Sequence, residues 1–247
     1  VDELANVPHD IRAPYVGLAA FTHKGGLHVH AVQKLARTYE HVDPALVGNE
    51  RIITISDMSG QTNVLIKAQA MGLPLAKGSP DVQKILAEVK RLESEGYEFE
   101  AAEASFELLI RRQLGHEAKS FELIEYHTTH RHQPGSTSET TEATVKLMVN
   151  GKAEYTVDEG DGPVNALDKA LRKALLPHFP QIAQMHLEDY KVRIIDSGSG
   201  TAAKTRVLVV SSNGNRTWGT VGVSSNVIDA SWEALVDSLE HFLMKSV

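Results

Sequence analysis

The second half of the chain repeats one order of secondary-structure elements twice, and this repeat constrains the fold more than any other feature of the sequence. Strands are predicted where short segments rich in apolar and β-branched residues alternate with polar ones. Three such segments precede a helical pattern in each copy: residues 121–126, 144–149 and 152–157, then 190–195, 206–211 and 217–223. The simplest account is an internal duplication of a βββα unit with pseudo-twofold symmetry.

Turn and helix signals support the repeat. Asn150-Gly151 lies between two predicted strands of the first copy, and both positions of such a turn tolerate positive φ. Asn213-Gly214 lies at the same place in the second copy. Helices are predicted from about Val164 to Leu176 and from Val227 to about Met244, because apolar residues recur there at helical spacing. Each helix would cover the apolar face of its own sheet.

The first half of the chain is predicted to be mainly helical. One helix begins near Gly26 and ends before Asp43-Pro44, and another spans about 63–71. Ser79-Pro80-Asp81 combines a helix cap, a proline in the first turn and an acid near the positive end of the helix dipole. A further helix is expected at about 102–114.

The expected fold class is therefore α+β. Two helical subdomains, residues 1–50 and 51–118, precede a duplicated βββα domain at 119–247. Its two units are expected at about 119–180 and 187–247. Neighbouring sheets could pack on each other or across a dimer.

The composition is that of a folded globular protein. Of the 247 residues, 42% are hydrophobic and 23% are charged, and a net charge of -7 without a run of lysine or arginine argues against a nucleic-acid partner. The absence of cysteine excludes disulfides, thiolate metal sites and a cysteine nucleophile. No apolar run is long enough to cross a membrane, and Val1–Ala5 does not begin like a secretion signal. We expect a cytoplasmic protein and, since the sequence does not begin with Met, a fragment of a longer one.

Histidines are the candidate chemical groups, but the residues alone give no complete catalytic or metal-binding set. His28 and His30 would point about 200° apart on the predicted helix, which disfavours a shared metal ion. His127, His130 and His132 lie beside a polar loop without a carboxylate at ligand spacing, and we expect them at a solvated edge. We therefore predict no metal site.

Spaced motifs along nearly the whole chain resemble the citramalate synthase and 2-isopropylmalate synthase family, which condenses acetyl-CoA with a 2-oxo acid. One motif is residues 21–31, in which Gly25 and Gly26 permit a tight turn shortly before His28. The others are residues 39–44, 98–109, 162–167, 189–193, 200–204 and 218–223. The resemblance is to the part of citramalate synthases that follows the catalytic (β/α)8 barrel.

The resemblance implies catalytic roles for two residues. His28 matches the linker histidine that the family inserts into the partner subunit's active site, and Tyr39 matches the tyrosine that accompanies it. The implied roles are proton transfer during acetyl-CoA enolisation or substrate positioning. A helix-cap or packing residue is the alternative for His28. In the family a divalent metal is held by the barrel, so this chain is expected to carry no cofactor and to be inactive alone.

The duplicated domain resembles the regulatory domain of the family, which dimerises and binds the end-product amino acid. Two glycine-rich loops suit such a ligand, because backbone N–H groups can meet its carboxylate and an acidic side chain its ammonium group. The predicted effector residues are Gly160, Asp161, Gly162, Asp196, Gly198, Gly200, Thr201 and Ala202. Glycines that only form turns are the alternative.

For the whole chain, the resemblance implies the regulatory part of a citramalate synthase, which makes citramalate from acetyl-CoA and pyruvate in isoleucine synthesis. A homodimer with isoleucine as feedback effector is expected, and the substrates would bind only where the barrel is present. The alternatives are the regulatory region of a 2-isopropylmalate synthase, with leucine as effector, and a separate amino-acid-binding dimerisation module.

Overall fold

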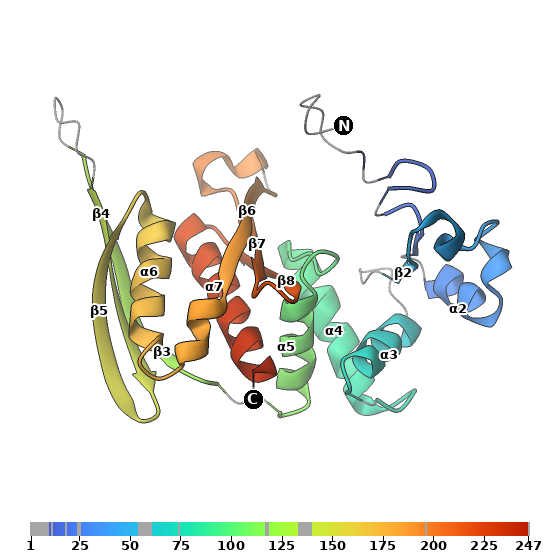
Figure 1. Ribbon diagram of the computed structural model, residues 1–247, viewed down its shortest axis with the longest axis horizontal. Coiled ribbons are helices and arrows are strands. Elements are labelled where there is room, and N and C mark those ends of the chain that lie inside the picture. The colour runs from blue at the N-terminus through green and yellow to red at the C-terminus, as the bar shows by residue number, and fades with distance from the viewer. Residues whose placement is uncertain are drawn as a thin grey trace. The chain divides into compact units, whose positions relative to one another are not determined.

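The computed structural model of the chain divides into two compact units, Val1–Glu93 and Ser94–Val247 (Figure 1). Each unit has its own buried residues. The structure describes residues 10, 12–17, 19–23, 26–53, 61–73, 75–116, 119–132, 140–195 and 197–246.

The first unit combines short helices with a small parallel sheet. Its elements are β1 (Thr22–His23), α2 (Gly26–Lys34), η1 (Ala36–Thr38), η2 (Pro44–Val47), β2 (Ile52–Ile53), α3 (Gln61–Ala70) and α4 (Pro80–Glu95). The predicted start of α4 is confirmed, since Ser79 Oγ accepts a hydrogen bond from the backbone N–H of Val82 at 3.4 Å. The apolar stripe of α4 is buried at Val82, Ile85 and Val89.

The second unit contains the two predicted βββα copies, preceded by one helix. Its elements are α5 (Glu103–Gln113), β3 (Glu122–Arg131), β4 (Thr140–Val149), β5 (Lys152–Gly160), α6 (Pro163–Leu175), η3 (Pro180–Gln184), β6 (His186–Ile194), η4 (Ser197–Ala202), β7 (Thr205–Ser212), β8 (Thr217–Ser224) and α7 (Val227–Lys245). The sheets are antiparallel with strand orders β3-β4-β5 and β6-β7-β8, and one helix follows each. The expected α+β fold with a duplicated βββα unit is confirmed.

The hairpin turns of the two copies differ. Asn150-Gly151 alone joins β4 to β5, with φ of 50° and 77°, as a type I′ turn requires. The loop between β7 and β8 is longer and spans 213–216. The side-chain oxygen of Asn213 accepts hydrogen bonds from the backbone N–H groups of Asn215 and Arg216, which stabilises the longer loop.

β3 extends further than the sequence predicts, from Glu122 to Arg131. His127 and His130 therefore lie on this strand, which is at the edge of its sheet. Both are exposed, as is His132, in agreement with the expected solvated edge. His130 Nδ1 lies 2.8 Å from Thr141 Oγ1 on β4.

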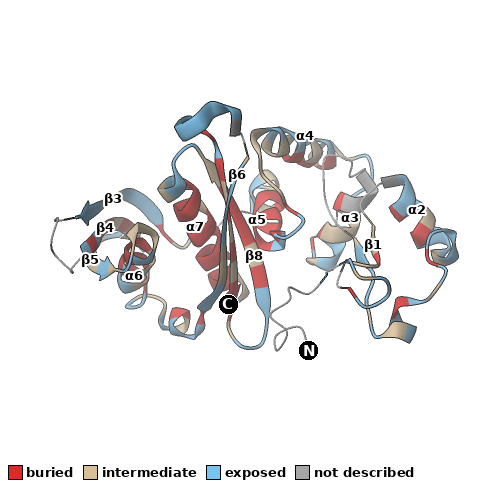
Figure 2. Ribbon diagram, turned by 90° about the horizontal axis from the view of Figure 1, so that it is seen from above, coloured by how far each residue is buried: buried red, intermediate tan, exposed pale blue. Residues whose placement is uncertain are grey.

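One hydrophobic cluster contains residues of both copies, while Val207 and Val209 of β7 form a second, smaller cluster with Ala230 and Ala234 of α7. Val145 of β4, Leu167 and Leu171 of α6 and Leu239 of α7 belong to the larger cluster. α7 packs on β7 and β8 of its own copy, on α6 of the other copy and on α5, so that it is buried along most of its length (Figure 2). None of the helices in the described part of the chain is long and apolar enough to cross a membrane.

α5 belongs to the second unit. The sequence places this helix in the subdomain 51–118, but its contacts are with β8 and α7. Gly219 of β8 permits the close approach, because a Cβ at this position would collide with the carbonyl oxygen of Ala101. The backbone N–H of Val221 also donates to Ser105 Oγ at 3.1 Å. The domain boundaries at residues 50 and 118 stay predictions.

Candidate functional site

The structure brings His28 and Tyr39 together. The two rings stack with centroids 4.2 Å apart and an angle of 24° between their planes. α2 directs Val29 and Val32 into the interior, which leaves His28 exposed on the outer side of the helix. Tyr39 is half exposed. The pair therefore presents an imidazole and a phenol side by side on the surface of the first unit.

A tight turn after α2 brings Tyr39 back to His28, which lies near the start of this helix. The backbone N–H groups of Tyr39 and Glu40 both donate to the carbonyl oxygen of Ala36, at 3.2 and 3.0 Å. The hydroxyl of Thr38 donates to the carbonyl oxygen of Leu35 at 2.8 Å. These bonds form the short helix η1 and place Tyr39 directly at its end.

Glu40 directly follows Tyr39 and is only 4% exposed. Its carboxylate accepts hydrogen bonds from Arg51 Nε at 2.7 Å and Arg51 Nη2 at 2.6 Å, and His23 Nε2 lies 2.9 Å from it. The hydrogen bonds from Arg51 outweigh burial and hold the pKa of Glu40 below its ordinary value. The sequence reasoning missed Glu40, although an acid directly after Tyr39 was the available signal.

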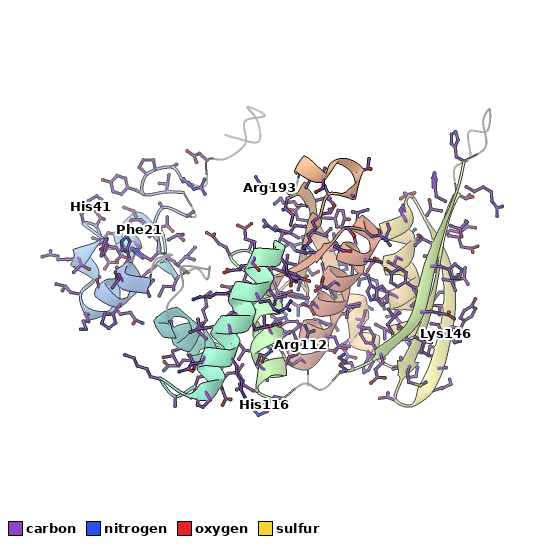
Figure 3. All side chains as sticks on the ribbon, turned by 180° about the vertical axis from the view of Figure 1, so that it is seen from behind. Phe21, His41, Arg112, His116, Lys146 and Arg193 are labelled. Atoms are coloured by element: carbon purple, nitrogen blue, oxygen red, sulfur yellow. The ribbon has the colours of Figure 1, made fainter. Side chains whose placement is uncertain are left out.

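A second aromatic pair lies in the same unit. The hydroxyl of Tyr15 lies 3.2 Å from His41 Nε2, and the two rings meet edge to face at 5.7 Å (Figure 3 labels His41). Asn49 Nδ2 donates to the carbonyl oxygens of Tyr15 and Gly17, both at 2.8 Å. Imidazole and phenol groups exchange protons or donate hydrogen bonds to a substrate. Within the described residues, no group of three or more His, Asp or Glu side chains gathers to hold a metal ion.

The first predicted effector loop lies between β5 and α6. Gly160 packs against the start of α6, because a Cβ there would lie 2.8 Å from Ala166 Cα and closer still to its backbone nitrogen. The backbone N–H of Asp161 donates to Asn165 Oδ1 at 3.3 Å. Gly162 is the N-cap of α6 and has open space where a Cβ would lie. Close packing on α6 thus explains Gly160, whereas Gly162 has space for a side chain and is at a helix N-cap, where glycine is favoured over alanine.

The second predicted effector loop lies between β6 and β7 and contains η4. Gly200 has φ of 58° and ψ of -126°, a conformation that only glycine adopts readily. Gly200 thus divides η4 in two, with Gly198 before the kink and Thr201 and Ala202 after it. Asp196 lies outside the described residues. The two loops occupy different positions within their copies of the repeat. The position equivalent to the first loop is 224–226, where Asn226 caps α7.

A row of acidic residues on α7 was missed by the sequence reasoning. They are spaced three or four positions apart and so lie on one face of the helix: Asp229, Glu233, Asp237 and Glu240. Each accepts a hydrogen bond from another part of the unit: in order, from Tyr126, Tyr97, Ser105 and Ser120. The spacing of the four acids can be read from the sequence. Their hydrogen-bond partners cannot, because each partner is at least 103 residues away. These contacts are structural, since they connect α7 to α5, to β3 and to the segments that precede each of these elements.

A cavity of about 760 Å³ lies between α5, residues 119–123 and α7. Its wall includes Phe121 and Trp232, and its volume is within the roughly 300–1,000 Å³ of small-molecule pockets. The polar groups Arg111 and Glu240 already form hydrogen bonds within the protein. None of the predicted effector residues in the described part of the chain lines this cavity.

Family models match both units. Residues 100–243 match the LeuA allosteric (dimerisation) domain. Residues 15–97 match the homocitrate synthase post-HMGL domain-like family. The change from one match to the other lies close to the division between the two units after Glu93.

The chain is similar to (R)-citramalate synthases over nearly its whole length. It is 50% identical to that of Aquifex aeolicus over 245 residues, 51% identical to that of Synechocystis sp. over 249 residues and 47% identical to that of Geobacter sulfurreducens over 246 residues. These alignments cover 99%, 98% and 100% of this chain but 46%, 45% and 47% of those proteins. The chain therefore spans slightly less than half the length of these relatives. The predicted resemblance to citramalate synthases is confirmed, and because the LeuA match covers more than half of the residues, the chain belongs to the LeuA allosteric (dimerisation) domain family.

Proposed function

We propose that this chain is the linker and regulatory part of a citramalate synthase, which joins acetyl-CoA, pyruvate and water to give (R)-citramalate and CoA. The observation that carries the proposal is the stacked pair of His28 and Tyr39, since the two residues implied to assist catalysis lie together on an exposed surface. The identity of 47–51% to citramalate synthases favours the same substrates.

In the complete enzyme, His28 and Tyr39 would enter the active site of the partner subunit. Removal of a proton from the methyl group of acetyl-CoA needs a base, and the resulting enolate needs hydrogen-bond donors. The imidazole of His28 would accept or hold the proton, and the hydroxyl of Tyr39 would donate a hydrogen bond. The barrel would supply the divalent metal, which polarises the 2-oxo acid.

The second unit would provide dimerisation and feedback inhibition by isoleucine. The backbone N–H of Gly162 at the start of α6 is suited to bind the carboxylate of the effector, and Asp161 is suited to bind its ammonium group. Ala202 and its neighbours would contact the aliphatic side chain. Isoleucine would inhibit by binding unequally to two global states of the enzyme.

A thermal-unfolding titration of the chain with isoleucine, leucine and valine tests the regulatory part of this proposal. A ligand that binds only the folded state adds about 2.7 kcal/mol at about 100 times its Kd, which raises the Tm by several degrees. A preference for isoleucine would support the proposal. A preference for leucine would move the assignment to 2-isopropylmalate synthase. The absence of a shift with all three would overturn the effector site and leave a dimerisation module.

A further inference from the structure

The carboxylate of Glu40 is buried and is held by three side-chain contacts, although the residue follows directly after the half-exposed Tyr39. Its side chain is 2% exposed, and burial of a charged carboxylate is costly unless its oxygens are hydrogen-bonded. Arg51 meets it with two N–H groups, a bidentate arrangement that fixes the plane of the carboxylate as well as its distance. His23 adds a third contact at 2.9 Å.

Both partners of Glu40 lie in or directly beside the small sheet of the first unit. His23 is the second residue of β1, and Arg51 directly precedes β2, which pairs with β1. The backbone N–H of Ile52 also donates to the carbonyl oxygen of Phe21 at 3.1 Å, so this sheet is held together next to both partners. The carboxylate of Glu40 therefore connects the turn after η1 to a fixed part of the unit.

Tyr39 is adjacent to this anchor. Its side chain is half exposed, and its ring stacks on His28 at 4.2 Å. Stacking of two surface rings contributes only about 0.5–1.5 kcal/mol, which is too little to fix the turn alone. Since Glu40 is the next residue, immobilising its side chain limits the backbone rotations that would carry Tyr39 away from α2.

We propose that Glu40, held by Arg51 and His23, is a positioning residue that keeps the ring of Tyr39 against the imidazole of His28. Its importance for catalysis rests on the proposed function, but the positioning itself is a property of this chain. Glu40 would not contact the substrate. It would act through the geometry of the pair.

The test uses nuclear magnetic resonance of this chain. A proton above an aromatic face is shifted upfield, so the Cε1–H resonance of His28 reports the stacking with Tyr39. Tyr39→Leu gives the resonance position without the stack. Glu40→Gln keeps the size of the side chain but loses the charge that Arg51 needs, and Arg51→Lys keeps the charge but loses the bidentate fork. Glu50→Gln, at an exposed position nearby, is the matched control.

The expected result is that Glu40→Gln and Arg51→Lys both remove more than half of the upfield shift of His28. The resonance of His30, which lies on the same helix, and the helical content of α2 should stay unchanged. An unchanged His28 resonance in either folded variant would overturn the proposal. If Glu40→Gln unfolds the first unit, Arg51→Lys decides the question. The resonance measurement tests the positioning of Tyr39 and does not require an active enzyme. The proposed catalytic role is tested separately, by activity assays of His28 variants.

Discussion

Ser105 of α5 donates a hydrogen bond of 2.7 Å to the carboxylate of Asp237 on α7, and its oxygen accepts another from the backbone N–H of Val221 at 3.1 Å. Both side chains are buried, with Ser105 4% and Asp237 5% exposed. Arg112, labelled in Figure 3, donates to the other oxygen of Asp237 at 2.7 Å. One hydroxyl group thus connects α5 to α7 and to β8.

Replacement of Ser105 by Ala should lower the free energy of unfolding by about 1–3 kcal/mol, because a buried carboxylate oxygen and a buried N–H both lose a partner. Denaturant unfolding would measure this loss. Ser225→Ala, at an exposed position before α7, should change the value by less than about 0.5 kcal/mol. Equal stabilities for the two variants would mean that the contact adds nothing to the fold.

The stabilising contribution of Glu107 should be lost in acid. Burial alone would raise its pKa, but hydrogen bonds from His241, Lys245 and Arg111 outweigh burial and lower the pKa to about 2. Because the folded pKa lies below the ordinary value of 4.5, its contribution of roughly 3 kcal/mol is present above pH 4.5 and is lost as the pH falls towards 2. The difference in unfolding free energy between wild type and Glu107→Gln should therefore shrink over this range. A constant difference would contradict the prediction.

The contribution of Glu240 to the free energy of unfolding should change with pH in the opposite direction. Burial raises the pKa of Glu240, although hydrogen bonds from Ser120 oppose the rise. A raised folded pKa favours the fold at low pH, and this contribution is lost as the pH rises through the folded value. Wild type should therefore lose stability relative to Glu240→Gln as the pH increases. The same pH series of unfolding curves checks both residues, and slopes of the same sign for the two variants would refute one of the assignments.

Gly160 and Gly162 separate a structural role from a ligand-binding role within one loop. Gly160→Ala should destabilise the second unit by about 1–3 kcal/mol, because its Cβ would meet the backbone of Ala166. Gly162→Ala has space for the methyl group and should cost less, about 0.5–1 kcal/mol, because alanine is a poorer helix N-cap than glycine. If an effector approaches this backbone closely, Gly162→Ala should weaken isoleucine binding by about tenfold, a loss of about 1.4 kcal/mol. Unchanged isoleucine binding would remove Gly162 from the effector site.

His28→Gln should reduce kcat of the complete enzyme by about 10²–10⁴-fold, the usual range for loss of a general acid or base. His30→Gln is the matched control, because His30 is also exposed on α2 and should keep nearly full activity. Steady-state kinetics with acetyl-CoA and pyruvate would compare the two. A similar kcat for both variants would exclude proton transfer by His28.

Local signals in the sequence were enough to predict much of this fold. Asn150-Gly151 specifies its turn through its own backbone preference, and Ser79 specifies the start of α4. The repeated order of strands and helices predicted both βββα copies. The length of β3 was underestimated, because residues 127–131 are polar and are held in the strand by pairing with β4.

Long-range contacts were not predictable in the same way. The buried state of Asp237 depends on Ser105, which is 132 residues away in the sequence. The position of α5 depends on Gly219, whose missing side chain makes room for Ala101. For the candidate site, the resemblance indicated His28 and Tyr39, but the contact between them depends on a turn stabilised by hydrogen bonds to Ala36.

The hydrogen bonds from β8 to side chains also affect how this protein would aggregate. Strands with unpaired backbone groups recruit strands from other molecules. On β8, the N–H groups of Val221 and Val223 already donate to Ser105 and Glu233. A shortened chain that begins at residue 119 would lack Ser105 and would leave the N–H of Val221 open to an incoming strand. It would also lack Tyr97, whose hydroxyl donates to Glu233, the partner of Val223. A truncated form that remains in solution should therefore begin before Tyr97.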